Sequence, residues 1–184
     1  MTRDQAWDLL QKNVKNQKMI FHSLASEAVL KALAKRLGRD EDKWALAGLL
    51  HDIDVEITNA DPATHALKAG DILAEYHLDE DMLDAIRMHN EMATGQQRTE
   101  EFQHALAAGE TITGLIYATA LVYPEKRIAD VKAKSIVKRM KQKAFAASVN
   151  REIIMECEEI GLTLQEFTEI CLEAMKEIGS EIGL

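Results

Sequence analysis

The sequence predicts an all-α protein, a bundle of about eight helices, and three observations support this prediction. The chain has 184 residues rich in Ala, Leu, Ile, Met, Glu and Lys, which favour helices. It has only two prolines, the residue that long helices tolerate least. No segment shows the alternation of apolar and polar residues that a half-buried strand requires. Hydrophobic residues make up 47% of the chain, so such a bundle can bury a substantial core.

Apolar spacing and capping signals place the helices in order. Asp40 can cap a helix, and Asp61-Pro62 combines a capping residue with proline at the first helical position. Thr163 and Glu166 form a capping box for the last helix. Helices are expected over residues 4–17, 22–37, 41–52, 62–76, 79–89, 99–122, 128–142, 150–160 and 164–182, with loops at 53–61 and 90–98.

These elements are expected to form a single domain over residues 1–184. Residues 20–122 contain the candidate functional residues and are interpreted as the core. Residues 123–184 are interpreted as a helical extension packed on that core. The oligomeric state is left open, a dimer included.

The charge of the chain limits its partners. A formal net charge of −9 argues against general nucleic-acid binding, which needs a basic face. It allows a small phosphorylated molecule as partner, because a bound metal can supply local positive charge. The basic run over 126–143 and the acidic stretch over 152–181 are interpreted as two solvated helix faces. The alternative is a rim of lysines that attracts phosphate.

Cysteine usage and the absence of long apolar runs predict the compartment. Cys157 and Cys171 have no CxxC spacing and are interpreted as buried thiols in a reducing environment. The first ten residues include an acid and lack the apolar centre of a signal peptide. No apolar run approaches the ~18–20 residues that a membrane helix needs. We therefore expect a cytoplasmic protein that does not bind a membrane.

The candidate site begins with the pair His51-Asp52, which follows the apolar run 45–50. A buried carboxylate at the end of such a run is costly unless it is paired or binds a metal. Adjacent helical residues diverge by about 100°, so both reach one ion only near a helix end, and further ligands must come from other helices. His22, expected at the start of its helix, and Glu110, the one acid in the small and apolar run 105–115, are the candidates.

The order His22, His51-Asp52 and Glu110 on helices resembles the HD-domain metal-dependent phosphohydrolases. The resemblance covers about residues 20–122 and includes the segments Gly48-Leu49-Leu50-His51-Asp52-Ile53-Asp54, His65-Ala66-Leu67-Lys68-Ala69-Gly70 and Ala85-Ile86-Arg87-Met88-His89-Asn90. It implies a helical bundle that holds a metal through His22, His51, Asp52 and Glu110. Glu110 departs from the family's usual aspartate by one methylene.

The resemblance also implies how many metal ions bind. Family members with two metals have further histidine ligands, which His65 and His89 match. Asn90 stands where a second adjacent histidine is expected, so one divalent ion is expected, with room for a second. The donor set suits Mn, Fe, Zn, Ni, Co or Mg. Asp54 and Glu56, in the following loop, are interpreted either as groups that orient water or a ligand histidine or as plain loop acids.

The expected activity is hydrolysis of a small phosphoester, such as a nucleotide, by metal-activated water. Asp52, His65 and His89 are the candidate catalytic residues, with His65 and His89 binding a second metal, holding phosphate or protonating the leaving oxygen. No substrate-binding residue is singled out. Three alternatives stay open: a non-catalytic module that binds metal and nucleotide, a di-iron oxygenase on the same scaffold, and a plain helical interaction domain. Asn90 argues against the oxygenase, which needs a full second metal site.

Overall fold

The structure of residues 1–184 is a computed structural model, and it confirms the all-α prediction. It contains ten α-helices, three 3₁₀ segments and no strand. The α-helices are α1 Arg3–Asn13, α2 Gln17–Leu37, α3 Glu41–Leu50, α4 Leu67–Leu73, α5 Glu80–Met88, α6 Glu91–Thr94, α7 Glu101–Leu121, α8 Ala133–Met140, α9 Arg151–Met155 and α10 Leu164–Glu177. The 3₁₀ segments are η1 Ala74–Tyr76, η2 Ile128–Asp130 and η3 Glu156–Glu158.

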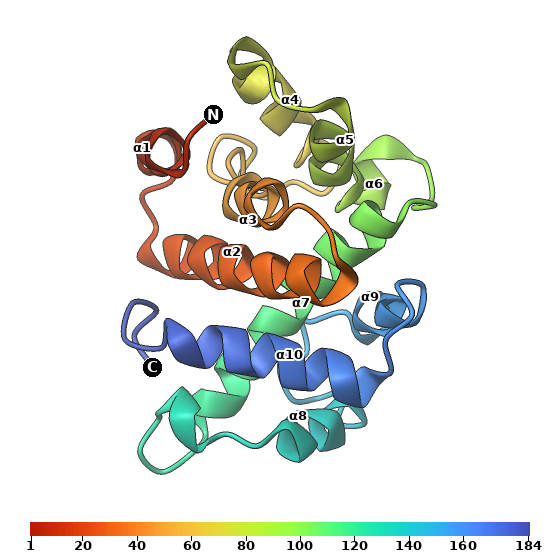
Figure 1. The fold of residues 1–184 in the computed structure, drawn as a ribbon. Helices are drawn as coiled ribbons and strands as arrows, with labels where there is room; N and C mark the ends of the chain where they lie inside the picture. Colours follow the sequence, from red (N-terminus) through yellow and green to blue (C-terminus); the bar gives the residue numbers. More distant parts are fainter.

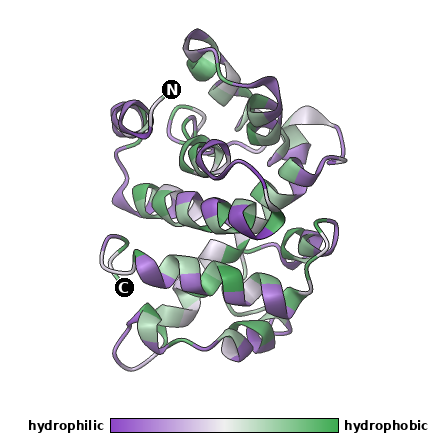
Figure 2. Cartoon of the chain, viewed as in Figure 1, coloured by the Kyte–Doolittle hydropathy of each residue, from purple (hydrophilic) through white to green (hydrophobic).

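The helices pack around a central pair, α2 and α7. In Figure 1, α2 and α10 lie side by side and α7 crosses behind both, while α3 covers the opposite side of α2. Hydrophobic and hydrophilic bands alternate along α2 and α10, as expected of helices with one buried face (Figure 2). A single cluster of 42 buried hydrophobic residues extends from Ala6 in α1 to Ile182 after α10. The chain therefore shares one apolar core from end to end.

Two glycines allow α3 and α7 to approach α2 closely. A Cβ atom on Gly48 of α3 would lie 2.5 Å from the Ser26 carbonyl oxygen of α2. A Cβ atom on Gly109 of α7 would lie 2.8 Å from a methyl carbon of Leu30. Both contacts are shorter than van der Waals packing permits. At Gly48 the contacts are with backbone atoms, so only glycine keeps α3 at this separation from α2, whereas at Gly109 the Leu30 side chain would have to move. The result is that polar residues on all three helices can meet at one point.

The first difference from the predicted boundaries concerns α2. This helix begins at Gln17, not at residue 22, because the Asn16 side chain accepts a hydrogen bond from the Lys18 backbone and caps it. His22 therefore lies in the second turn of the helix. The expectation that His22 stands at a helix start was wrong. Further along the chain, Asp40 and Thr163 cap α3 and α10 as predicted.

The second difference concerns Asp61-Pro62, which does not start a helix. Asp61 accepts a hydrogen bond from the Ala63 backbone, but the chain continues through turns until α4 begins at Leu67. Ala66, just before α4, has a φ of 78°, a left-handed conformation that no helix of L-residues continues. The local cap is present, but contacts with distant residues prevent the helix that it would start.

Smaller differences occur elsewhere along the chain. The predicted loop at 90–98 contains the single turn α6, and the predicted helix at 99–122 is formed by α7 without interruption at its glycines. The predicted helix at 128–142 divides into η2 and α8. Basic α8 packs against acidic α10, in keeping with the interpretation of two helices with solvated faces.

Two further observations concern the thiols and the length of the helices. Cys157 and Cys171 are both free and buried, as predicted. Burial raises the pKa of Cys157 to about 11, so this thiol stays protonated at neutral pH. None of the helices is both long enough and apolar enough to cross a membrane.

A buried arginine joins the helices on either side of α7. The Arg98 side chain is only 3% exposed, and its Nη1 donates to the carbonyl oxygens of Met88 and His89 at the end of α5. Its Nε and Nη2 donate to both carboxylate oxygens of Glu156 in η3, at 2.7 and 2.6 Å. His104 adds a third contact to Glu156, at 2.8 Å. The network holds the end of α5 against the C-terminal half of the chain.

We expect Glu156→Gln to lower the free energy of unfolding at pH 7 by about 2 kcal/mol, because buried Arg98 would lose its two-point carboxylate partner and keep only Glu91, whose carboxylate lies 3.6 Å away. Burial raises the pKa of Glu156, but hydrogen bonds from Arg98 and His104 outweigh it and lower the pKa below 4.5. A lowered pKa in the folded state gives stability that is complete above the ordinary pKa and disappears as pH falls through the lowered one. The gap in the free energy of unfolding between wild type and variant should therefore disappear as the pH falls into the acid range.

Urea denaturation of both proteins at pH 7 and pH 3 measures this gap. Glu158→Gln is the matched control, since Glu158 belongs to the same 3₁₀ segment but is exposed. A gap that stays constant with pH would show that the Glu156 charge does not stabilise the fold.

Candidate metal centre

Six side chains from five parts of the chain meet beside the crossing of α2, α3 and α7. His22 comes from α2 and Glu110 from α7, while the pair His51-Asp52 follows directly after the last residue of α3. The remaining two come from the turn before α4 and from the end of α5. They are the side chains that the sequence singled out: His22, His51, Asp52, His65, His89 and Glu110.

Asp52 is at the centre of this cluster. Its Oδ1 lies 2.9 Å from His65 Nε2, 3.4 Å from His51 Nε2 and 3.5 Å from His89 Nε2. Its Oδ2 lies 3.6 Å from His22 Nε2. The Asp52 side chain is only 9% exposed. One buried carboxylate therefore faces the Nε2 atoms of four histidines.

The donor atoms divide into two groups that share Asp52. His22, His51 and Asp52 form one group, and Asp52, His65 and His89 form the other, each with its ligand atoms within 4.8 Å of one another. Glu110 adjoins the first group, with its Oε2 3.5 Å from His22 Nε2. Its other oxygen accepts a hydrogen bond from the Thr111 hydroxyl. Three protein donors around an open position is an arrangement typical of catalytic metal sites.

Backbone carbonyl groups orient two of the histidine rings. His51 Nδ1 lies 2.8 Å from the Gly48 carbonyl oxygen, and His89 Nδ1 lies 2.6 Å from the Ile86 carbonyl oxygen. A carbonyl oxygen only accepts hydrogen bonds, so each Nδ1 must carry the proton. In the neutral ring, Nε2 then has a free lone pair directed at Asp52. This is the protonation state that a metal-binding histidine needs.

A threonine orients the third ring. His22 Nδ1 lies 2.9 Å from Thr113 Oγ1, and the Thr113 hydroxyl donates to the Glu110 carbonyl oxygen at 2.6 Å. Because its one proton is used there, Thr113 must accept a hydrogen bond from His22 Nδ1. His22 Nε2 and His51 Nε2 then face each other at 3.1 Å. Two lone pairs at this distance repel each other unless a proton or a metal ion lies with them.

An aspartate is positioned to orient the fourth ring. His65 Nδ1 lies 2.8 Å from Asp54 Oδ1, in an ion-pair contact whose angle falls short of a hydrogen bond. Neither of these buried atoms has another hydrogen-bond partner. The second oxygen of Asp54 accepts a hydrogen bond from the Ala69 backbone at 3.0 Å, which holds the carboxylate in place. His65 is therefore enclosed between the carboxylates of Asp52 and Asp54.

The pKa shifts in the cluster show that its buried carboxylates are stabilised by positive charge on their neighbours. Burial lowers the pKa of His51 to about 4, so this ring is neutral. Burial also lowers the pKa of His65, but the contacts with Asp52 and Asp54 outweigh it and raise the pKa to about 10. The neighbouring histidines likewise overcome the effect of burial at Asp52 and Glu110 and lower both carboxyl pKa values. Without a metal, protons on the histidines thus balance the carboxylates.

These observations show that the residues fit a divalent cation. Four imidazole Nε2 atoms and the oxygens of Asp52 and Glu110 converge in a mostly buried space. Nitrogen and carboxylate donors together suit Zn, Mn, Fe, Co and Ni better than Mg, which prefers oxygen. A bound cation would remove the repulsion between facing lone pairs and replace the protons that otherwise balance the carboxylates.

One residue that completes the cluster, Thr113, was absent from the predicted set. Thr113 lies three residues after Glu110, on the same side of the helix, a spacing that could have identified it. Asn90 binds no cluster atom, because its Nδ2 donates to the carbonyl oxygens of Pro62 and His65, each at 2.9 Å. It thereby holds the turn that carries His65. These backbone carbonyl partners leave no signal in a sequence.

The helical bundle and this donor set define a class of metal-binding helical proteins, and comparison with known proteins identifies the family. The HD domain family model matches residues 19–140, about two thirds of the chain. The chain therefore belongs to the HD domain family. Proteins of this family are in general hydrolases, and the His/Asp cluster could hold their metal.

Curated relatives match about half of the chain or less. Ribonuclease Y of Nitratidesulfovibrio vulgaris (strain DP4) is 37% identical over 76 residues, which are 41% of this chain and 15% of that protein. Ribonuclease Y of Mycoplasma mycoides is 28% identical over 97 residues, which are 53% of this chain and 22% of that protein. The chain thus spans a fifth or less of the length of most of these relatives. No solved structure matches the chain.

Proposed function

We propose that this protein is a metal-dependent phosphohydrolase that acts on a small phosphoester. One observation carries the proposal: four histidine Nε2 atoms converge on the Asp52 carboxylate, and their Nδ1 atoms are each placed against an acceptor of the protein. Packing alone does not account for histidine rings whose Nε2 atoms all face one carboxylate. Membership of the HD domain family supports hydrolysis as the reaction class.

We further propose two metal positions that share Asp52. His22, His51, Asp52 and Glu110 would hold the first ion. Asp52, His65 and His89 would hold the second. The resemblance in sequence favoured one ion, because Asn90 replaces an expected histidine. The distances around Asp52 support the second position, since its three donors lie as close together as those of the first.

The chemistry follows from what each side chain holds in place. A divalent ion bound there lowers the pKa of its water and polarises a phosphoryl oxygen. Thr113 and the carbonyl groups of Gly48 and Ile86 fix the rings of His22, His51 and His89, so the donors need no rearrangement. Where the second position is empty, His65 holds a proton between Asp52 and Asp54 and is the group placed to donate it to a leaving oxygen.

A small substrate is favoured over RNA, although the matched relatives are called ribonuclease Y. The chain covers only 15% to 22% of those proteins, so the match does not extend to most of their length. The net charge of −9 opposes binding of a long polyanion. A nucleotide or another small phosphoester carries few charges, and the metal centre can balance these without a basic surface.

Removal and replacement of the metal test this proposal. We expect the purified protein to contain up to two transition-metal ions per chain, and a chelator to abolish hydrolysis that Mn²⁺ or Co²⁺ then restores. The screen compares p-nitrophenyl phosphate, bis(p-nitrophenyl) phosphate, nucleoside monophosphates and a short oligoribonucleotide. Elemental analysis measures the metal, and release of p-nitrophenol or phosphate measures the reaction.

The other outcomes separate the alternatives. Bound metal with no turnover of any ester would favour a binding module over the hydrolase. Two bound irons with consumption of dioxygen would favour the oxygenase. A chain that takes up no metal even after reconstitution would contradict both the metal centre and the hydrolase.

A further inference from the structure

The structure contains an apolar cavity on the flank of His22, between α2 and α7. Its volume is about 240 Å³. Lys18 is the only residue with a full charge among those that line it, apart from His22 itself. The walls are otherwise made by the hydrophobic and aromatic side chains of Phe21, Ala25, Tyr117, Ala118, Leu121 and Met175.

This cavity adjoins the metal centre through shared residues. His22 and Thr113, which form one hydrogen-bonded pair of the cluster, both line it. His22 and Gly114 also line a second and more polar cavity of about 310 Å³, together with Glu110. His22 thus lines both the polar cavity that contains Glu110 and the apolar cavity.

Gly114 lines both of these spaces. A Cβ atom on Gly114 would lie 3.2 Å from a methyl carbon of Val149, so the backbone of α7 is closely packed there. Val149 belongs to the segment between α8 and α9 that borders the polar cavity. A ring in the apolar cavity would therefore lie directly beside His22, which both spaces share.

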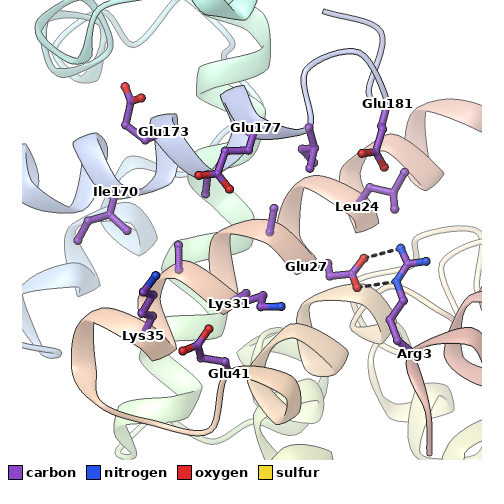
Figure 3. A pocket seen from close by; sticks show the side chains of 14 residues that line it. Arg3, Leu24, Glu27, Lys31, Lys35, Glu41, Ile170, Glu173, Glu177 and Glu181 are labelled. Carbon is purple, nitrogen blue, oxygen red and sulfur yellow. Dashed lines mark hydrogen bonds and ion pairs between the residues drawn. The ribbon is translucent and has the colours of Figure 1, made fainter.

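The largest of the cavities described does not adjoin the metal centre. It measures about 530 Å³ and lies between α2 and α10, on the face of α2 shown in Figure 3. Charged side chains line much of it, and Glu27 there is paired with Arg3 at 2.9 Å. It shares no residue with the metal centre. Size alone therefore does not identify the substrate position.

The dimensions and lining of the apolar cavity limit what can occupy it. A dry cavity of about 150 Å³ suffices for a benzene molecule, so 240 Å³ holds a substituted ring or a two-ring heterocycle. Phe21 and Tyr117 provide aromatic surface against which a flat ring can stack. A charged or strongly hydrated group would lose its water there without gaining partners.

We propose that this cavity binds the organic part of the substrate, and that this part is an uncharged aromatic or heteroaromatic ring. The inference rests on the proposed function, because it assumes that the phosphoryl group is held at the metal centre beside His22. The substrate class is then an aryl or nucleoside phosphoester, with the ring between α2 and α7. Lys18, which is exposed and has no carboxylate within 4 Å, can meet a further anionic group at the cavity mouth.

Filling the cavity tests the proposal. Ala118 lines the cavity and is partly exposed, so tryptophan at this position can enter it without disturbing the core. With the metal-loaded protein, we expect Ala118→Trp to weaken the binding of phenyl phosphate about tenfold or more, the usual effect of losing one well-fitted apolar group. Binding of inorganic phosphate, which needs no ring site, should be unchanged. Titration calorimetry measures both ligands.

A tryptophan in the other cavity provides the matched control. Ala32 lies on the same helix as His22 but lines the charged cavity between α2 and α10. Ala32→Trp should bind phenyl phosphate as the wild type does. Thermal unfolding of both variants and their metal content show that fold and metal centre are intact.

The outcomes separate this inference from the proposed function. If Ala118→Trp weakened the binding of phenyl phosphate and of inorganic phosphate equally, or weakened neither, the proposed ring site would be overturned. Wild-type protein that binds phenyl phosphate no better than inorganic phosphate would do the same. Tight binding of phenyl phosphate by a wild type that hydrolyses no ester would instead retain the ring site and contradict the hydrolase.

Discussion

Replacement of Asp52 by asparagine should remove metal from both proposed positions and lower the rate of the proposed phosphoester hydrolysis at least about 1000-fold, since metal catalysis contributes several kcal/mol and about 4 kcal/mol corresponds to that factor. Asp52 is the only residue that belongs to both donor groups. An asparagine amide carries no charge, so both positions would lose their shared counter-charge. Elemental analysis and hydrolysis of p-nitrophenyl phosphate by the same preparation measure the two effects.

A second aspartate serves as control for this experiment. Asp71 has a side chain that is 71% exposed and pairs only with Lys68. Asp71→Asn changes the net charge of the protein by the same amount and should retain metal and activity. The metal centre as described would be wrong if Asp52→Asn kept two ions per chain. Loss of metal with no wild-type hydrolysis of any ester would support the centre but reject the proposed reaction.

Replacement of Gly48 by alanine should lower the free energy of unfolding by about 3 kcal/mol, the upper part of the range for overpacked cores. The new Cβ atom would lie 2.5 Å from the Ser26 carbonyl oxygen and 2.9 Å from the Glu27 backbone nitrogen. These are backbone atoms, so no side-chain rotation relieves the contact, and α3 must move away from α2. Urea denaturation measures the change in stability.

The same substitution should weaken metal binding. The Gly48 carbonyl oxygen orients His51, whose Nε2 lies 3.1 Å from His22 Nε2 on α2. Separation of the two helices would pull these ligands apart. Titration of the metal-free protein with Co²⁺, followed by its absorption spectrum, measures the affinity for the first ion.

Gly70→Ala is the matched control, because Gly70 lies in α4 and a Cβ atom there meets nothing within 4 Å. Alanine in an open helical position should stabilise the protein by up to about 1 kcal/mol. Equal effects of the two substitutions would show that the crossing of α2 and α3 is not close-packed at Gly48. A large loss of stability with unchanged Co²⁺ affinity would show that the ligands tolerate the movement.

Sequence reasoning succeeded where the signal is local. Asp40 caps α3 and Thr163 caps α10 because a capping side chain acts on backbone groups within three residues. His22, His51, Asp52 and Glu110 were predicted because histidines and carboxylates next to buried apolar runs are costly unless they have partners. His65 and His89 were predicted only through the resemblance to the HD-domain family. Asp54 was expected either to orient a histidine or to be a plain loop acid, and it lies 2.8 Å from His65 Nδ1.

Sequence reasoning failed where distant residues compete for backbone groups. The signal at Asp61-Pro62 predicts a helix in which the His65 carbonyl would accept from the Ala69 backbone. In the structure the Ala69 N–H donates to Asp54 Oδ2, and the His65 carbonyl accepts from Asn90 Nδ2. Both partners are far away along the chain, so no local sequence pattern predicts these hydrogen bonds. The turn that results is what brings His65 to Asp52.

The sequence by itself determined the helical class and most of the helices, and its resemblance to the HD-domain family pointed to the full set of side chains that meet at the candidate site. The helices follow from spacing and composition, which act over a few residues. Only the tertiary structure decided which nitrogen of each histidine faces Asp52, because Thr113, Asp54 and backbone carbonyl groups select it. It also decided that the donors form two groups and that an apolar cavity adjoins His22. These features depend on how closely α2, α3 and α7 approach, and that distance results from packing at Gly48 and Gly109.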